Sequence, residues 1–208
     1  MRLAVIGDIH GYDAALDQAL ALIAGLGCDR IVSVGDLIDG FPGNDRVVET
    51  VRAIPGLVAV RGNHDELPLD DVSAGNREWL LALPERERCA EWDVCHYSPR
   101  QREEKVNSVH RAWNAFDDGD FANAVVGHAH IGTVYRYRRG MGAAAEEVAG
   151  WNRDLPLADG YRHIVVNPSL AYNRGRLTSP AFSVIDTTAR TVRFISLELP
   201  PISDLMRR

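Results

Sequence analysis

The sequence lacks an apolar run long enough to cross a membrane and lacks an excess of basic residues. It holds 29 acidic residues against 23 Lys and Arg, a formal net charge of −6. Stable nucleic-acid binding is therefore not expected, because proteins that bind the phosphate backbone usually carry a basic excess. The chain also reaches Asp8 and His10 too early for the apolar core of a signal peptide. We expect no membrane association and a cytoplasmic location.

Cysteine is scarce, and this limits the compartment and the chemistry. Cys28, Cys89 and Cys95 are odd in number and widely separated. Such a set favours free thiols in a reducing compartment over a disulfide framework, and we assign these residues no chemistry. Internal repeats and low-complexity tracts are also missing. With 208 residues and 46% hydrophobic composition, the chain suits one well-buried core, so we predict a single domain over residues 1–208.

The first part of the chain alternates apolar strand patterns with helical periodicity. The apolar and helical spacings predict strands over 3–7, 30–34 and 56–60, with helices over 12–24 and 46–53 between them. This order predicts parallel pairing. The pattern weakens over 66–91, where a helix near 76–83 is cut by Pro84 and the segment reads as a surface cap. A strand over 91–97, a helix over 105–116 and a strand over 122–126 follow.

The second part is predicted to be mostly antiparallel. Strand-like segments separated by turns cover 134–138, 164–166, 181–186 and 192–197, and residues 187–190 form the expected link of a terminal hairpin. Residues 140–150 are rich in Gly and Ala, so we expect a mobile loop there. The whole pattern predicts two packed sheets flanked by helices.

Polar side chains follow a glycine at the ends of four predicted strands. The motifs are Gly7-Asp8-Ile9-His10, Gly35-Asp36, Gly62-Asn63-His64-Asp65 and Gly127-His128-Ala129-His130, and a fifth strand ends in His96. Ligands in open α/β sheets bind beyond the carboxyl ends of strands, so these loops are expected to converge. A single buried His is more often a satisfied core residue than a ligand. Here, however, five of the seven histidines stand at strand ends.

The residue types at these strand ends predict metal binding. Nitrogen and oxygen ligands are numerous, thiolate ligands are missing, and the set is larger than one ion needs, which indicates two divalent ions. Two cations close together lower the pKa of a bridging water and neutralise phosphoryl oxygens.

In these motifs the sequence resembles the calcineurin-like metallophosphoesterase family, with the motifs in the family's order over about residues 3–131. The relatives it resembles most are small prokaryotic phosphodiesterases and diadenosine-tetraphosphatase-related proteins. The resemblance implies an α/β fold, a four-layer α-β-β-α sandwich with two packed mixed β-sheets.

The resemblance also implies that Asp8, His10 and His130 hold one metal, that Asn63, His96 and His128 hold the other, and that Asp36 bridges both. Manganese is the expected metal, with Fe, Zn, Ni, Co or Mg as alternatives. Asn167-Pro168-Ser169 is similar to a late Asn-Pro-Gly-Ser loop of the family, without the glycine.

These assignments predict hydrolysis of small phosphoesters, preferably diesters, by attack of a metal-bridging hydroxide. His64 is the expected general acid, and either Asp65 or Asp39 is expected to orient its ring. The alternative role for His64 is that of a packing residue. The alternative role for Asp39 is that of a residue that caps its loop.

The chain departs from the phosphoprotein phosphatases of the superfamily, because Asp39-Gly40-Phe41 lacks the Arg that grips phosphate in those enzymes. Alternative activities are phosphomonoesterase, Ser/Thr protein phosphatase and dinucleoside polyphosphate hydrolase, and a non-catalytic scaffold is a rival class. The sequence does not define the oligomeric state.

Among the basic residues, Arg61 is the favoured single residue for structuring the site. Two basic groups are expected mainly as exposed charges: Arg100, Arg102, Lys105 and Arg111, and Arg136, Arg138 and Arg139.

Overall fold

The computed structural model describes residues 1–147, 150–174 and 178–199, and it contains two six-stranded sheets. The first sheet has the order β3-β2-β1-β11-β12-β9 and the second β4-β5-β6-β10-β7-β8. Strands of the first sheet are β1 (Arg2–Ile6), β2 (Arg30–Ser33), β3 (Val58–Ala59), β9 (Asp154–Pro156), β11 (Ala181–Asp186) and β12 (Thr191–Ser196). Strands of the second are β4 (Arg86–Cys89), β5 (Trp92–Cys95), β6 (Asn123–Val126), β7 (Thr133–Tyr137), β8 (Ala145–Glu147) and β10 (Arg162–Val166).

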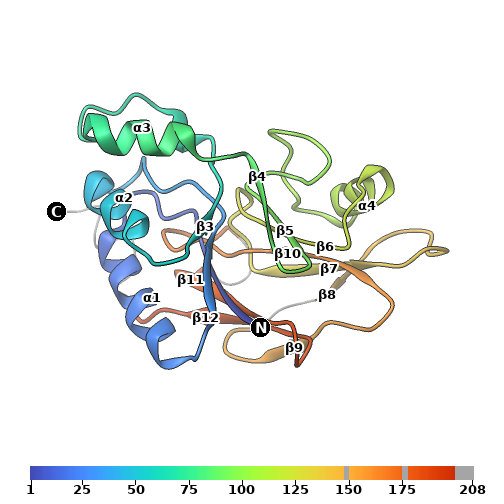
Figure 1. Ribbon diagram of the computed structural model, residues 1–208. Helices are drawn as coiled ribbons and strands as arrows, with labels where there is room; N and C mark the ends of the chain where they lie inside the picture. The colour runs from blue at the N-terminus through green and yellow to red at the C-terminus, as the bar shows by residue number, and fades with distance from the viewer. Residues whose placement is uncertain (148–149, 175–177, 200–208) are drawn as a thin grey trace.

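Helices α1 (Asp13–Gly25) and α2 (Asn44–Arg52) lie on the outer side of the first sheet, and α4 (Val109–Asp118) lies on the outer side of the second (Figure 1). Helix α3 (Ala74–Ala82) packs against α2 and against a short 3-10 helix, η1 (His64–Glu66). Leu3 and Val5 of β1 pack between the sheets, whereas Ala4 and Ile6 pack against α1 and α2. A strand buried on both faces needs a continuous apolar sequence, and β1 has one. On the far side, Phe116 of α4 packs against Ile164 of β10. The predicted α-β-β-α order of layers is therefore confirmed.

Both sheets are mixed, as predicted. β1, β2 and β3 pair in parallel, and so do β5, β6 and β10. The remaining pairs are antiparallel. They join β11, β12 and β9 to the first sheet and β7, β8 and β4 to the second. Parallel strands point their carboxyl ends toward one edge, so this topology fixes where the strand-end loops meet.

Three short strands were not predicted. β4 lies in the segment expected to be a surface cap, and β8 lies in the 140–150 segment expected to be a mobile loop, of which residues 148 and 149 are outside the described residues. Both are edge strands whose backbones complete the hydrogen-bond ladder of a neighbour. Glu147 of β8 also pairs with Arg136 of β7 at 2.7 Å. β9 likewise adds to the edge at β12.

Helix α4 begins at Val109 rather than at the predicted Lys105, and a side-chain cap explains the difference. Ser108 is extended, and its Oγ accepts a hydrogen bond from the backbone N–H of Arg111 at 3.3 Å. Serine is a favoured N-cap residue because it satisfies an amide that the helix leaves free. Within the described residues, no helix has the length and apolarity needed to span a bilayer.

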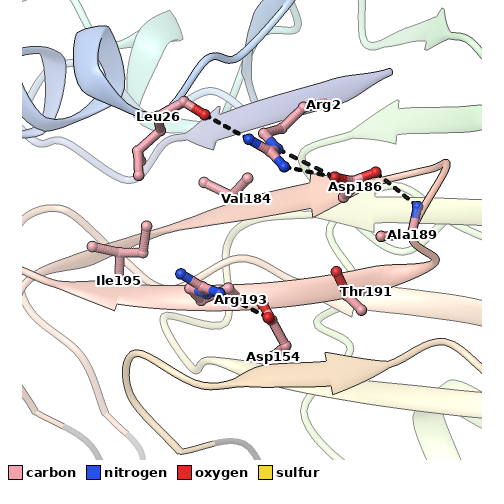
Figure 2. Close-up of a pocket in the computed structure, with 9 residues that line it drawn as sticks. All are labelled: Arg2, Leu26, Asp154, Val184, Asp186, Ala189, Thr191, Arg193 and Ile195. Atoms are coloured by element: carbon pink, nitrogen blue, oxygen red, sulfur yellow. Dashed lines mark hydrogen bonds and ion pairs between the residues drawn. The ribbon is translucent and has the colours of Figure 1, made fainter.

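A shallow pocket opens on the outer face of the first sheet (Figure 2). Its charged groups neutralise one another: Arg2 pairs with Asp186 at 3.0 Å, and Arg193 pairs with Asp154 at 2.7 Å. Arg2 also donates to the carbonyl of Leu26 at 2.8 Å. Arg2 begins β1, so this pocket is at the opposite end of that strand from Asp8. We assign it no function.

Arg162 supports the end of α4, which gives a test of the fold. Its guanidinium donates to the carbonyls of Phe116, Gly119 and Phe121 at 2.6, 2.5 and 2.8 Å. Charged hydrogen bonds of this kind contribute about 1.5–3 kcal/mol each before non-additivity. We predict that Arg162→Ala lowers the free energy of unfolding by about 2–4 kcal/mol, measured by urea denaturation. Arg46→Ala, which removes exposed pairs with Asp13 and Asp17, is the control and should change little. Equal effects of the two substitutions would contradict this account.

Candidate metal centre

All of the predicted strand-end ligands lie at one edge of the sheets. Asp8, His10, Asp36 and His130 place one ligand atom each within 4.8 Å of one another, and so do Asp36, His96 and His128. Asp36 belongs to both groups. Asn63 joins the second, since its Oδ1 is 3.1 Å from His96 Nε2. The ligands come from the loops after β1, β2, β3, β5 and β6.

The backbone at this edge is held in an uncommon conformation. Six non-glycine residues of the site have left-handed φ angles between 48° and 73°: Asp8, His10, Asp36, Asp39, His128 and His130. For residues with a Cβ this region costs about 1–2 kcal/mol each. Such strain persists only where the surrounding structure fixes it, and it clusters at functional sites.

Gly35 and Gly62 allow two of the loops to touch. A Cβ on Gly62 would lie 2.1 Å from Asp36 Oδ1, and a Cβ on Gly35 would lie 2.5 Å from the backbone nitrogen of Gly62. Real Cβ atoms do not approach other atoms so closely. These glycines therefore provide contact between two backbones, beyond the turn-forming role that any glycine can have.

Asp65 lies beneath this contact and is fully buried. Its carboxylate accepts hydrogen bonds from the backbone N–H groups of Asp36, Leu37 and Gly62 at 2.9, 2.7 and 2.8 Å. Burial and the neighbouring Asp36 carboxylate raise the pKa of Asp65 to about 6, although these N–H groups act in the opposite direction. Asp65 thus ties the two loops together. Of the two carboxylates expected to orient the His64 ring, Asp39 contacts it, whereas the Asp65 carboxylate is used by the backbone.

Three histidines are oriented by backbone carbonyls. The Nδ1 atoms of His10, His96 and His130 lie 2.9, 2.7 and 3.1 Å from the carbonyl oxygens of Asp39, Val34 and Tyr172. A carbonyl only accepts, so each Nδ1 carries a proton, and Nε2 is the atom that each ring turns toward the clusters. This is the arrangement that orients a metal-binding imidazole.

The facing atoms fit a bound cation. His10 Nε2 lies 3.2 Å from His130 Nε2, and His96 Nε2 lies 3.2 Å from Asp36 Oδ2. The first contact sets two ring nitrogens against each other. At the second, burial lowers the pKa of His96 but the Asp36 carboxylate raises it to about 9, so this position attracts a positive charge. Asp36 Oδ2 is itself buried without a hydrogen-bond partner among the described residues. Lone pairs that converge in a buried site repel unless a positive charge lies between them, so this donor set fits divalent metal ions.

The ionisation of the site also favours metal binding. Burial lowers the pKa of His10, and burial together with the His96 and Lys105 charges lowers the pKa of His128 to about 4. Both rings are therefore neutral ligands at physiological pH. Burial alone would raise the pKa of Asp8, but its contact with His130 lowers it.

His64 lies at the open side of the clusters, with 32% of its side chain exposed. Its Nδ1 is 2.6 Å from Asp39 Oδ2, its backbone N–H donates to Asp36 Oδ1 at 2.9 Å, and its Nε2 is 3.9 Å from Asp36 Oδ2. The ring is anchored at Nδ1 and presents Nε2 to the space beside the shared carboxylate.

The loop after β10 supports the site through Ser169, which belongs to the Asn-Pro-Ser motif, and through Tyr172, which the sequence alone did not identify. Ser169 Oγ donates to the carbonyl of Asp8 at 2.7 Å, and the Tyr172 ring stacks on His10 at 5.4 Å. The Asn-Pro-Ser motif marks the start of this loop, but nothing in the local sequence marks Tyr172. On the other side, Tyr97 meets His128 and His96 edge-on at 5.0 and 4.9 Å.

Arg61 and most of the basic groups lie outside the ligand clusters. Arg61 pairs with Glu66 at 3.0 Å and donates to the carbonyls of Leu81 and Leu83, so it holds α3. The first basic group is largely ion-paired, with Arg100 and Arg111 both against Glu104. Arg102 pairs with Glu66 and Glu85. These contacts support the expectation that these arginines are mainly structural or exposed charges.

Comparisons with known proteins agree with this geometry. A family model for calcineurin-like phosphoesterases matches residues 1–168. A metallophosphoesterase structure from Sphaerobacter thermophilus is 26% identical, with a TM-score of 0.86, over 98% of this chain and 90% of that one. The hypothetical protein PH1004 from Pyrococcus horikoshii is 15% identical, with a TM-score of 0.73, over 99% and 91% of the two chains.

A structure described as a novel archaeal phosphodiesterase is 15% identical, with a TM-score of 0.56, and the alignment covers 95% of this chain and 100% of that one. Among curated proteins, none matches this sequence. The family match over most of the chain agrees with the two His/Asp clusters that the fold brings together. The chain therefore belongs to the calcineurin-like phosphoesterase family and is a metal-dependent phosphoric ester hydrolase.

Proposed function

We propose that this protein is a dinuclear metal-dependent phosphodiesterase that acts on small phosphoesters. The observation that carries the proposal is the pair of ligand clusters that share Asp36. Asp8, His10 and His130 would hold one ion and Asn63, His96 and His128 the other, with Asp36 bound to both. When bound, two divalent cations activate water at neutral pH and neutralise charge on the phosphoryl oxygens. We propose manganese, with Fe, Zn, Ni, Co or Mg as alternatives, because the ligand set offers nitrogen and oxygen atoms and no thiolate.

His64 is proposed as the general acid that protonates the leaving oxygen. Its Nε2 faces the reaction space, and the Asp39 carboxylate at 2.6 Å fixes the ring through Nδ1. Asp39 is therefore a positioning residue. Asp65 acts one step further away, because it holds the backbone of Asp36 at the place where that carboxylate serves both clusters.

The preference for small diesters rests on the surroundings of the site. The position of the Arg that grips phosphate in phosphoprotein phosphatases is occupied here by Gly40, and the ring of the next residue, Phe41, stacks on Tyr12 at 4.3 Å. Phe41 is thus a packing residue, and no cation follows Asp39. A diester carries one negative charge fewer than a monoester and needs less cationic clamping. Tyr97 packs edge-on against His128, and we propose that it narrows the entrance and so favours small substrates.

The rival activities are a phosphomonoesterase, a protein phosphatase and a dinucleoside polyphosphate hydrolase, and substrate comparison separates them. A non-catalytic scaffold would not need both ligand clusters and a correctly placed His64. We also propose a single domain over the whole chain and a cytoplasmic location. Cys28, Cys89 and Cys95 are free thiols, which is typical of a reducing compartment.

The shared carboxylate gives the first test. Asp36→Asn should reduce occupancy of both metal sites, whereas His130→Ala should chiefly empty one, because only Asp36 contributes to both clusters. Metal content of the purified variants is measured by elemental analysis after loading with Mn²⁺. His110→Ala, on the exposed side of α4, is the matched control and should bind as much metal as the wild type. Full occupancy of both sites in Asp36→Asn would remove the residue from the bridging role.

The general acid gives the second test. His64→Asn should retain its metals and lose about 10²-fold or more in kcat on alkyl esters. The loss should be smaller on nitrophenyl esters, because good leaving groups need little protonation. Asp39→Asn should show the same pattern with a smaller loss, since it only releases the ring. An equal loss on both ester types would argue against acid catalysis by His64.

Substrate class gives the third test. With Mn²⁺ supplied, kcat/KM should be higher for a bis-nitrophenyl diester than for a mononitrophenyl ester, and lowest for a phosphoserine peptide. The physical reason is the missing phosphate-gripping cation after Asp39 together with the narrowed entrance at Tyr97. Preference for the peptide would make protein phosphatase the leading assignment.

A further inference from the structure

The loop after β10 carries Arg174 to the rim of the metal centre. The backbone N–H of Arg174 donates to the carbonyl of the ligand His130 at 2.8 Å. Just before it, the Asn173 side chain accepts from the N–H of Ser169 at 2.8 Å and donates to the carbonyl of Ser169 at 3.0 Å. Arg174 is exposed, yet its backbone is fixed relative to the site.

The Tyr172 ring contacts both Arg174 and two residues of the first ligand cluster. It stacks on His10 with centroids 5.4 Å apart and planes 20° apart, and its centroid is 4.9 Å from that of His130. Arg174 Cζ lies 5.7 Å from the Tyr172 centroid, within the range of a cation–π contact. The guanidinium is therefore held one aromatic ring away from the ligands.

The charge of Arg174 is uncompensated within the part of the chain that the structure describes. Other arginines around the entrance already have partners, with Arg61 and Arg102 on Glu66 and Arg100 on Asp118. No ion pair joins Arg174 to a described carboxylate. An oriented guanidinium without a carboxylate partner beside a phosphoester site is suited to bind phosphate, which it can contact with two parallel N–H donors.

We propose that Arg174 binds a second phosphate group of the substrate, carried on the same molecule as the phosphoester that is cleaved. This inference rests on the phosphoesterase function proposed above and makes Arg174 a specificity-determining residue. The Arg174 guanidinium packs on the Tyr172 ring, and it is Tyr172 that contacts His10 and His130, so Arg174 lies beside the scissile phosphoryl group and does not hold it. It contacts a phosphate displaced toward the His10 and His130 side, and it therefore favours diesters that carry an additional phosphate.

Two esters that differ by one phosphate test this inference. They are the nitrophenyl ester of thymidine 5′-phosphate and the same ester with a 3′-phosphate. Wild-type protein with Mn²⁺ should have the higher kcat/KM on the 3′-phosphorylated ester. Arg174→Gln should lower kcat/KM on that ester by about 10- to 100-fold, the effect of one charged hydrogen-bonded contact, mainly by raising KM. On the ester without the 3′-phosphate the change should stay within about twofold, and Arg174→Lys should recover part of the loss.

Arg139→Gln is the charge-matched control. Arg139 is exposed in the turn after β7, at the end of that strand away from His130, so both esters should be cleaved as by the wild type. Metal content and the melting temperature of each variant report on folding. If Arg174→Gln lost activity equally on both esters, its role would be structural and the inference would be overturned. If Arg174→Gln lost no activity on either ester, the inference would also be overturned.

Binding measurements separate this inference from the proposed function. If wild-type protein cleaves neither ester, isothermal titration of thymidine 3′,5′-bisphosphate and thymidine 5′-phosphate into Mn²⁺-loaded protein decides the matter. The phosphate site is supported, although the hydrolytic function fails, if wild-type protein binds the bisphosphate more tightly than thymidine 5′-phosphate. This difference in affinity should be lost in Arg174→Gln and retained in Arg139→Gln. Equal affinity of wild type and Arg174→Gln for the bisphosphate, or no binding at all, overturns it.

Discussion

The close approach of two loop backbones at Gly35 and Gly62 is the constraint on which the site depends. A side chain at either glycine would collide with the other loop within 2.5 Å. Asp65 then bonds to backbone N–H groups of both loops and fixes their separation. This contact places Asn63 and His64 beside Asp36, whose carboxylate belongs to both ligand clusters. If the loops moved apart, the second cluster would lose Asn63, and His64 would leave the shared carboxylate.

The parallel and the antiparallel strands of the sheets contribute different parts of the site. Parallel strands bring the ligand loops to one edge, because their carboxyl ends face the same way. The later strand β10, parallel to β6 and antiparallel to β7, leads into the loop that supports those ligands from outside. Ser169 binds the backbone of Asp8, and Tyr172 accepts from His130. The first part of the chain supplies the chemistry, and the second fixes its orientation.

Features with a local cause could be predicted from the sequence, and features with a distant cause could not. The apolar runs before Gly7, Gly35 and Gly127 give the strands, and their polar followers give the ligand positions, because both follow from a few adjacent residues. β4 and β8 are short and polar, and they are strands only because a neighbouring edge offers unpaired backbone groups. The start of α4 depended on one side-chain cap at Ser108. Tyr172 and Arg174 could not be assigned to the site from sequence, because they belong to it only through contacts with His10 and His130, which lie far away in sequence.

The central position of β1 determines when the molecule can be completed during synthesis. β1 pairs with β2 on one side and with β11 on the other, where Arg2 lies opposite Asp186. One of its two hydrogen-bond ladders therefore waits until Asp186 of β11 has left the ribosome. Non-local pairing of this kind slows folding, because the entropy of closing a long loop is lost before the contacts form. Asp8 and His10 thus reach their final positions late, and the nascent chain passes through a stage in which an apolar strand edge is open to aggregation or to chaperones.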